Sequence, residues 1–211
     1  MIGTGNGNRP PVKASCRNVA AQGHSTIPRG TEELRLRVEQ LSLREQIERN
    51  HFLLMRLNAA NARLTQSLEQ GDAFEAIAEI TANLIGSEEV AIFDYHRAEQ
   101  NFSLAWSSGV EADALQPFLC GAGMFGRAVQ QGTSQFQERQ PETALLPHEK
   151  NLTACIILKS SGEIVGVIAI FGLLPQKNNL EWADFELLKF LEIYGAVAIK
   201  FHRLQGRQVS P

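Results

Sequence analysis

The sequence has few cysteines and no long apolar run, and both absences narrow the class of protein. Cys16, Cys120 and Cys155 are too few and too scattered for a disulfide framework, and none stands in a Cys-x-x-Cys pair that would bind zinc. No apolar run approaches the ~20 residues that a membrane-spanning helix needs, and residues 1–30 lack the apolar segment of a secretory signal. We therefore expect a cytoplasmic protein with no metal site and no membrane insertion.

An excess of one sign of charge is also missing. The 20 Lys and Arg residues nearly balance the 23 Asp and Glu residues, so the net charge is −3. This balance gives no basic surface for nucleic acid. The five histidines are widely spaced, and neither a His-Glu-x-x-His nor a Gly-x-Ser-x-Gly motif occurs. The sequence therefore predicts a protein that is not an enzyme and does not bind nucleic acid.

What is present divides the chain into four stretches. With 44% hydrophobic residues, 211 residues can form one domain with a sizeable core and an appendage. Stretches rich in Gly, Asn, Pro and Ser cannot bury enough apolar surface to offset their ordering entropy. The four predicted stretches are a disordered tail at 1–30, a coiled-coil helix at 31–70, a folded domain at 71–203 and a flexible tail at 204–211.

The stretch 31–70 carries a seven-residue spacing. Thr31 followed by acids is typical of a helix start, and the steps along one seam then alternate between four and three residues, as coiled-coil positions do. Asn61 falls at position a, where a buried asparagine can fix parallel register. We expect a parallel homodimer; the alternative is one amphipathic helix packed on its own domain. The seam is Leu36, Gln40, Leu43, Ile47, Asn50, Leu54, Leu57, Asn61, Leu64 and Leu68.

Residues 71–203 predict an α+β domain with a five- or six-stranded antiparallel sheet. The strands at 152–159 and 164–171 are nearly all apolar, which is typical of central strands covered on both faces. Alternation places Phe102, Leu104 and Trp106 on one face of their strand. The predicted elements are a helix capped by Asp72 and ended by Gly86, strands at 90–96 and 102–107, a short helix at 124–129, strands at 134–138, 152–159 and 164–171, and a long helix at 182–203.

A glycine-rich segment precedes the third predicted strand. Gly121, Gly123 and Gly126 open a short apolar helix, and Gly132 closes it. This spacing predicts close backbone approach at the start of the helix and a glycine stop at its end. A phosphate-cradling loop is the weaker interpretation, because no Gly-Lys-Ser/Thr completes a P-loop.

The segment resembles the midsection of the GAF domain family, with Gly121, Gly123, Gly126, Val129 and Gly132 at that family's glycine and valine positions. The resemblance extends from about residue 64 to residue 202. It implies a GAF-like fold with the first and last helices on one sheet face and a small-molecule pocket on the other. The aromatic and polar residues near the glycine segment are then either core or ligand contacts: Trp106, Phe118, Cys120, Met124, Phe125, Arg127 and Phe136.

The family's known chemistries have specific motifs that this chain does not reproduce. The spacing of Cys120 and Cys155 differs from the cysteine set of GAF-fold methionine sulfoxide reductases. The Cys-His pair that attaches a bilin and the Asn-Lys-x-Asp-Glu signature of nucleotide-binding domains are both missing. We therefore expect Cys120 and Cys155 to form neither a disulfide nor a metal site, and the sequence identifies no cofactor.

Two functions remain open. The first is a sensory or regulatory module of signal transduction that forms a homodimer and binds a small molecule or a signalling partner. The second is a ligand-free GAF-fold scaffold that docks a partner through its helices. Dimerisation is expected to depend on Leu36, Leu43, Ile47, Leu54, Leu57, Asn61 and Leu64.

The glycine segment generates a first prediction. Replacing Gly126 with leucine should destabilise the domain by about 1–3 kcal/mol, because a bulky side chain would overpack a helix that approaches neighbouring backbone closely. Dimerisation should survive, and affinity for any ligand should fall. Melting temperature, light scattering and binding test this. If Gly126→Leu changes neither stability nor binding, the segment is an ordinary surface loop.

Overall fold

The structure is a computed structural model that describes residues 29–99, 101–111, 115, 123–139, 146, 149 and 151–208. Residues 1–28 of the tail predicted at 1–30 therefore lie outside the described residues, whereas its last two residues belong to the first helix. The chain separates into two compact units, 1–44 and 45–211, and the boundary falls inside the first helix. None of the helices in the described ranges is both long and apolar enough to cross a membrane.

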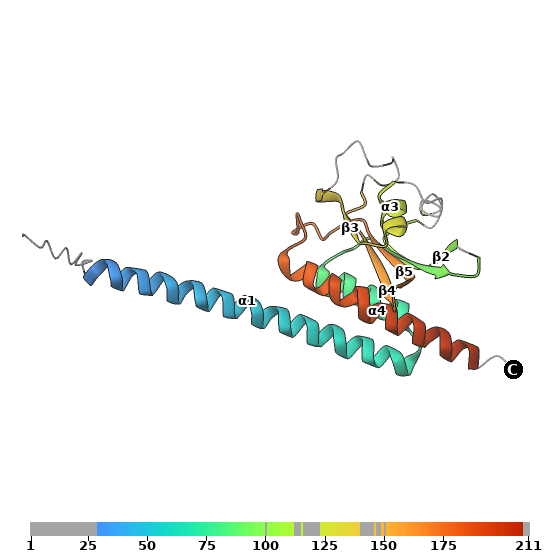
Figure 1. Cartoon of the computed structure of the whole chain (residues 1–211), viewed down its shortest axis with the longest axis horizontal. Helices are drawn as coiled ribbons and strands as arrows, with labels where there is room; N and C mark the ends of the chain where they lie inside the picture. Colours follow the sequence, from blue (N-terminus) through green and yellow to red (C-terminus); the bar gives the residue numbers. More distant parts are fainter. Residues whose placement is uncertain are drawn as a thin grey trace, which may run out of the picture. The chain divides into compact units, whose positions relative to one another are not determined.

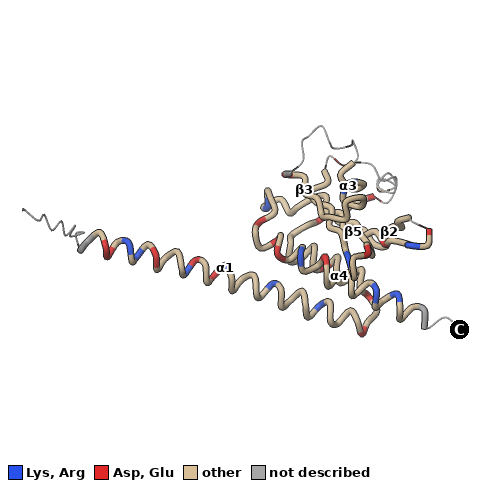
Figure 2. The backbone as a smooth tube through the Cα atoms, viewed as in Figure 1, with Lys and Arg blue, Asp and Glu red and all other residues tan. Residues whose placement is uncertain are grey.

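Helix α1 (Arg29–Gln70) is the predicted long helix, and its two ends differ in burial. It begins two residues before Thr31 and ends at Gly71, whose φ of +74° is left-handed. Every residue from 31 to 52 is exposed, and Arg and Glu residues are interspersed along this part (Figure 2). From residue 53 onward one face is buried, with Ala60 and Leu64 in the core of the second unit.

The sheet has five antiparallel strands in the order β2-β1-β5-β4-β3. Strand β5 lies at its centre, as the apolar sequence of the predicted β4–β5 pair indicates. The two strands join through Ser161 and Gly162, both with positive φ, which matches the twist of a tight hairpin. The strands are β1 (Val90–His96), β2 (Asn101–Ser108), β3 (Gln135–Phe136), β4 (Ala154–Ser160) and β5 (Glu163–Ile170).

Each face of the sheet carries its own apolar cluster, because successive side chains of a strand point to opposite faces. On β5, Ile168 packs with the cluster that includes residues of α1, α2 (Ala73–Ile80) and α4 (Trp182–Gln208). Its neighbour Val167 packs with the cluster that includes α3 (Gly123–Gln131). Figure 1 shows α4 and α3 on opposite sides of the sheet. The first and last helices of the domain therefore share one face, as the resemblance implies.

A β-bulge makes one sequence prediction wrong. Ile92 pairs with Trp106, but Phe93 pairs with Leu104, so β2 has an extra residue between them. Such a residue reverses the alternation of side chains along the strand. Phe102 consequently packs with the α3 cluster and Trp106 with the opposite cluster, rather than on one face.

Several element ends also differ from the predictions. The helix from residue 73 changes to a π-helix, η1 (Thr81–Ile85), before the left-handed Gly86 ends it. Asp72 stands at the N-cap, but its side chain makes no cap hydrogen bond and pairs with Arg63 at 2.7 Å instead. That bond lowers the pKa of Asp72. The strand predicted at 134–138 is shortened by a 3-10 helix, η3 (Gln137–Arg139). Helix α4 continues to Gln208, beyond its predicted end.

A buried ionic cluster joins α1, η1 and α4. The Asp184 carboxylate is fully buried and contacts Arg56 Nη2 and Lys177 Nζ, each at 2.6 Å, while accepting the backbone N–H of Glu181 at 2.7 Å. Arg56 also donates to the carbonyl oxygen of Leu84. Because both cations are largely withdrawn from water, the Asp184 charge is needed to balance them.

Replacing Asp184 with alanine should therefore lower the free energy of unfolding by about 3–5 kcal/mol, since it leaves two cations buried without their counter-ion. The control is Glu186→Ala on the same helix, which removes the more exposed pair with Lys189 and should cost no more than about 1 kcal/mol. Urea unfolding measures both. Equal losses in the two variants would contradict the role given to Asp184.

Candidate functional site

The N-terminus of α3 holds a buried carboxylate. Both oxygens of Glu149 accept hydrogen bonds from the first amides of the helix, Met124 N–H and Phe125 N–H, each at 3.0 Å. Leu146 N–H donates a third bond at 3.1 Å, and Glu149 is 0% exposed. Unpaired N–H groups and the helix dipole attract anions to this end of a helix. Here the anion is a side chain of the protein itself.

Gly123 provides the room for this carboxylate. Its φ is +69°, and a Cβ placed on it would lie 2.0 Å from Glu149 Oε2. A side chain at this position would therefore displace the carboxylate. This contact is the close backbone approach that the glycine spacing predicts, and Glu149 is what approaches.

Beneath α3 the site is aromatic and fully packed. Phe125 is 1% exposed, and its ring meets the rings of Phe93 and Phe102 edge-on at centroid distances of 5.1 and 5.6 Å. Met124 is also fully buried. Such edge-to-face pairs stabilise beyond simple burial. These side chains serve as core in this structure.

Cys155 lies under the same helix, and its surroundings oppose ionisation. The thiol is free and buried. Burial raises the pKa of Cys155, the nearby Glu149 carboxylate raises it further, and Arg127 acts in the opposite direction. Because the thiolate is the nucleophile in cysteine chemistry, Cys155 is poorly suited to covalent catalysis. Cys120 lies outside the described residues, so the predicted absence of a bond between the two cysteines stays a prediction.

Comparison with known proteins identifies the fold. No protein-family model matches the sequence, and neither does any curated protein. Among solved structures, the GAF domain of a phosphoenolpyruvate-protein phosphotransferase from Coxiella burnetii is 15% identical with a TM-score of 0.57, covering 72% of this chain and 98% of that one. The chain contains a GAF-fold domain.

Two further structures share this GAF fold while belonging to different kinds of protein. One is a methyl-accepting chemotaxis protein, 16% identical with a TM-score of 0.52, matched over 69% of this chain and 98% of that one. The other is a free methionine-R-sulfoxide reductase from Neisseria meningitidis, solved with its substrate, 16% identical with a TM-score of 0.53 over 72% and 93% of the two chains. At such identities the likeness concerns the fold alone.

The described members of the predicted ligand-binding set lie on two different faces of the sheet. Met124, Phe125 and Arg127 lie on α3, whereas Trp106 and Phe136 pack against the cluster on the opposite face of the sheet. The bulge in β2 explains why Trp106 lies on that face. Phe136 lies there because its ring contacts the ring of Phe185 of α4 edge-on, at a centroid distance of 5.0 Å. Phe118 and Cys120 lie outside the described residues. Ligand binding by this set stays a prediction.

Sequence reasoning missed Glu149, the residue that organises the α3 site. It stands in a polar stretch with two prolines, which predicts only a loop. The only indication in the sequence is that Glu149 is an acid able to pair with the glycine-rich start of a helix. Because the two are separated by 25 positions, the sequence alone does not show that they meet.

Replacing Glu149 with alanine should destabilise the GAF domain by about 3 kcal/mol, because each buried N–H left without an acceptor costs ~1–3 kcal/mol. Replacing the exposed Glu138 with alanine is the control, and its effect should stay within about 0.5 kcal/mol. Urea unfolding measures the difference.

The vacated helix end supplies a second readout on the same variants. Inorganic phosphate should raise the melting temperature of Glu149→Ala more than that of the unaltered protein, since an anion can then occupy the exposed amides. Unfolding profiles that match the Glu138→Ala control, with no response to phosphate, would show that Glu149 does not satisfy the helix end.

Proposed function

We propose that the protein is a non-enzymatic regulatory module of signal transduction, which forms a parallel homodimer through α1 and responds to a small molecule. We further propose that it acts in the cytoplasm and binds neither nucleic acid nor membrane. The GAF fold supports the regulatory part, because matched structures include a domain of a chemotaxis protein and one of a phosphotransferase. The burial and raised pKa of Cys155 disfavour a thiol-based enzyme.

The exposed seam of α1 is the observation that carries the proposal. Leu36, Leu43, Ile47 and Leu54 recur at coiled-coil spacing, and each side chain is more than half exposed. A single helix gains nothing from such a stripe in water, whereas a second copy would bury it. Burying a large aliphatic side chain is worth ~1.5–3 kcal/mol, so several such residues in each chain can support a dimer.

The seam is not exposed along its whole length. Leu64 is buried in the core of its own domain, and Leu57 and Leu68 pack against that core. For these residues the burial supports the alternative of a helix packed on its own domain. Asn61 remains exposed. We therefore assign the dimer contact to residues 36–54. Asn61 then lies at the edge of this contact, where the seam of the helix begins to be buried by its own domain.

A ligand-free scaffold is the second candidate, and one observation favours it. The α3 helix end, which is chemically suited to an anionic ligand, is filled by Glu149. Melting temperatures measured against a panel of metabolites separate the two functions, because a ligand that binds only the folded state must raise the midpoint. Mass spectrometry of the natively purified protein would identify a retained molecule. A scaffold gives no shift and no retained molecule.

The dimer is tested by changing two stripes of the same helix. Leu36→Glu/Leu43→Glu places charges at seam positions that are 55% and 52% exposed in one chain, and it should convert the dimer to a monomer. Leu34→Glu/Leu41→Glu changes equally exposed leucines, 63% and 59%, that lie off the seam, and the dimer should persist. Light scattering across a dilution series measures both.

A monomeric unaltered protein would show that the seam has been misread. If the seam variant stays dimeric, the contact lies elsewhere. The exposed apolar residues of α4, Ile193, Tyr194, Val197, Phe201 and Leu204, would then be the next surface to change.

A further inference from the structure

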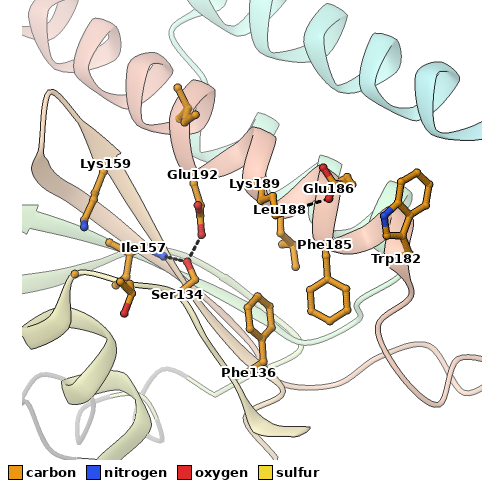
Figure 3. A pocket seen from close by; sticks show the side chains of 13 residues that line it. Ser134, Phe136, Ile157, Lys159, Trp182, Phe185, Glu186, Leu188, Lys189 and Glu192 are labelled. Atoms are coloured by element: carbon orange, nitrogen blue, oxygen red, sulfur yellow. Dashed lines mark hydrogen bonds and ion pairs between the residues drawn. The ribbon is translucent and has the colours of Figure 1, made fainter. Parts of the chain in front are cut away.

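An open pocket of about 600 Å³ lies between α4 and the β3 end of the sheet, away from the α3 site. Figure 3 shows side chains from three segments pointing into it: the stretch after α3, strand β4 and one side of α4. Of the residues that the sequence predicts as ligand contacts, Phe136 lines this pocket. The lining includes Ser134, Phe136, Lys159, Trp182, Phe185, Leu188 and Glu192.

One part of the pocket is apolar and aromatic. Phe136 and Phe185 meet edge-on and form one wall, and the core residue Leu188, at 1% exposure, also lines the pocket. Trp182 stands at the rim with half of its surface in water. An apolar group of the size of a phenyl or butyl group would cover surface that water now contacts, which is favourable.

The other part carries one charge of each sign. The Lys159 ammonium lies against the backbone of Gly132, where a Cβ would come within 2.7 Å of Nζ, and no described residue pairs with it. Glu192 accepts the hydroxyl hydrogen of Ser134, and it has no other bond to the described part of the chain. Ser134 in turn accepts Ile157 N–H at 3.0 Å, which fixes its hydroxyl between β4 and α4.

We propose that this pocket binds a free α-amino acid with a large apolar side chain. The ligand carboxylate pairs with Lys159, its ammonium pairs with Glu192, and its side chain lies along Phe136 and Phe185. The proposal deepens the regulatory function, since it names a ligand for the module, but it places that ligand away from α3. It does not depend on the dimer.

Charge decides between this ligand and simpler ones. An aromatic acid without an ammonium would use Lys159 but bring a second negative charge near Glu192. An aromatic amine would use Glu192 and add a positive charge near Lys159. Like charges brought together in a partly desolvated site oppose binding. A zwitterion matches both groups, and it carries the apolar body that the aromatic wall fits.

Calorimetric titration of the full chain tests the ligand class. The probes are L-phenylalanine, 3-phenylpropionate, which lacks the ammonium, and 2-phenylethylamine, which lacks the carboxylate. We expect phenylalanine to bind at least about tenfold more tightly than either analogue, because each omission removes one charge-assisted bond. No heat of binding with phenylalanine overturns the proposal, and so does equal affinity for either analogue.

Two variants tie the binding to this pocket. Lys159→Met keeps the aliphatic stem and removes the ammonium, and Glu192→Gln can still accept the Ser134 hydroxyl hydrogen but carries no charge. Each should weaken phenylalanine binding by about tenfold. The control is Lys200→Met, a partly buried lysine that donates to Ser160 O at 3.2 Å and does not line the pocket; its affinity should be unchanged.

Melting temperatures within a few degrees of the control show that the pocket variants are folded. Unweakened binding in both folded variants overturns the assignment to this pocket. If the variants do not fold, the analogue comparison on the unaltered protein still decides the ligand class. Light scattering on the same samples keeps the two proposals apart, because a failed titration with an intact dimer rejects only the ligand.

Discussion

The constraint on which the domain depends is that its central strands are buried on both faces. Neighbouring residues of β5, such as Val167 and Ile168, belong to different apolar clusters, and both are fully buried. A sheet of this kind is stable only when helices cover each side. Among the labelled helices, α3 packs on one face, and α2, α4 and the second half of α1 pack on the other. The Asp184 cluster lies where this second group meets, and it fixes α1 to α4 through Arg56.

This requirement divides α1 into two parts that the heptad pattern does not distinguish. The spacing that leaves Leu43 and Ile47 exposed continues into Leu64, which is core. A seven-residue repeat describes any helix with one apolar stripe, whether the stripe meets a second copy or the same chain. The position along α1 at which the stripe changes from exposed to buried follows only from where the helix packs on the sheet face.

The sequence predicts the features that local chemistry controls. The β-branched and aromatic residues of 90–96 define β1 at its full length, and Ser161-Gly162 predicts the hairpin. It does not predict the features that depend on distant partners. The bulge opposite Ile92 and Phe93 arises from pairing between strands, and so Trp106 is assigned to the wrong face. Asp184 and Arg56 are separated by 128 positions, and neither is distinguishable in the sequence from a surface charge.

The same limit applies to the glycine segment when it is compared with the proposed pocket beside α4. The glycine segment correctly indicates a helix start with close backbone approach, which is suited to an anion. The sequence does not show that Glu149 already fills it. A ligand anion at α3 would have to displace the Glu149 carboxylate, which accepts three backbone N–H bonds. Its net binding free energy would be only the amount by which its own interactions with the helix end exceed those of Glu149. Beside α4, Lys159 makes no hydrogen bond or ion pair within the described ranges, so the carboxylate of the proposed ligand would displace no described side chain from it. The net binding free energy of a weakly binding metabolite would therefore be more favourable in the proposed pocket beside α4 than at α3.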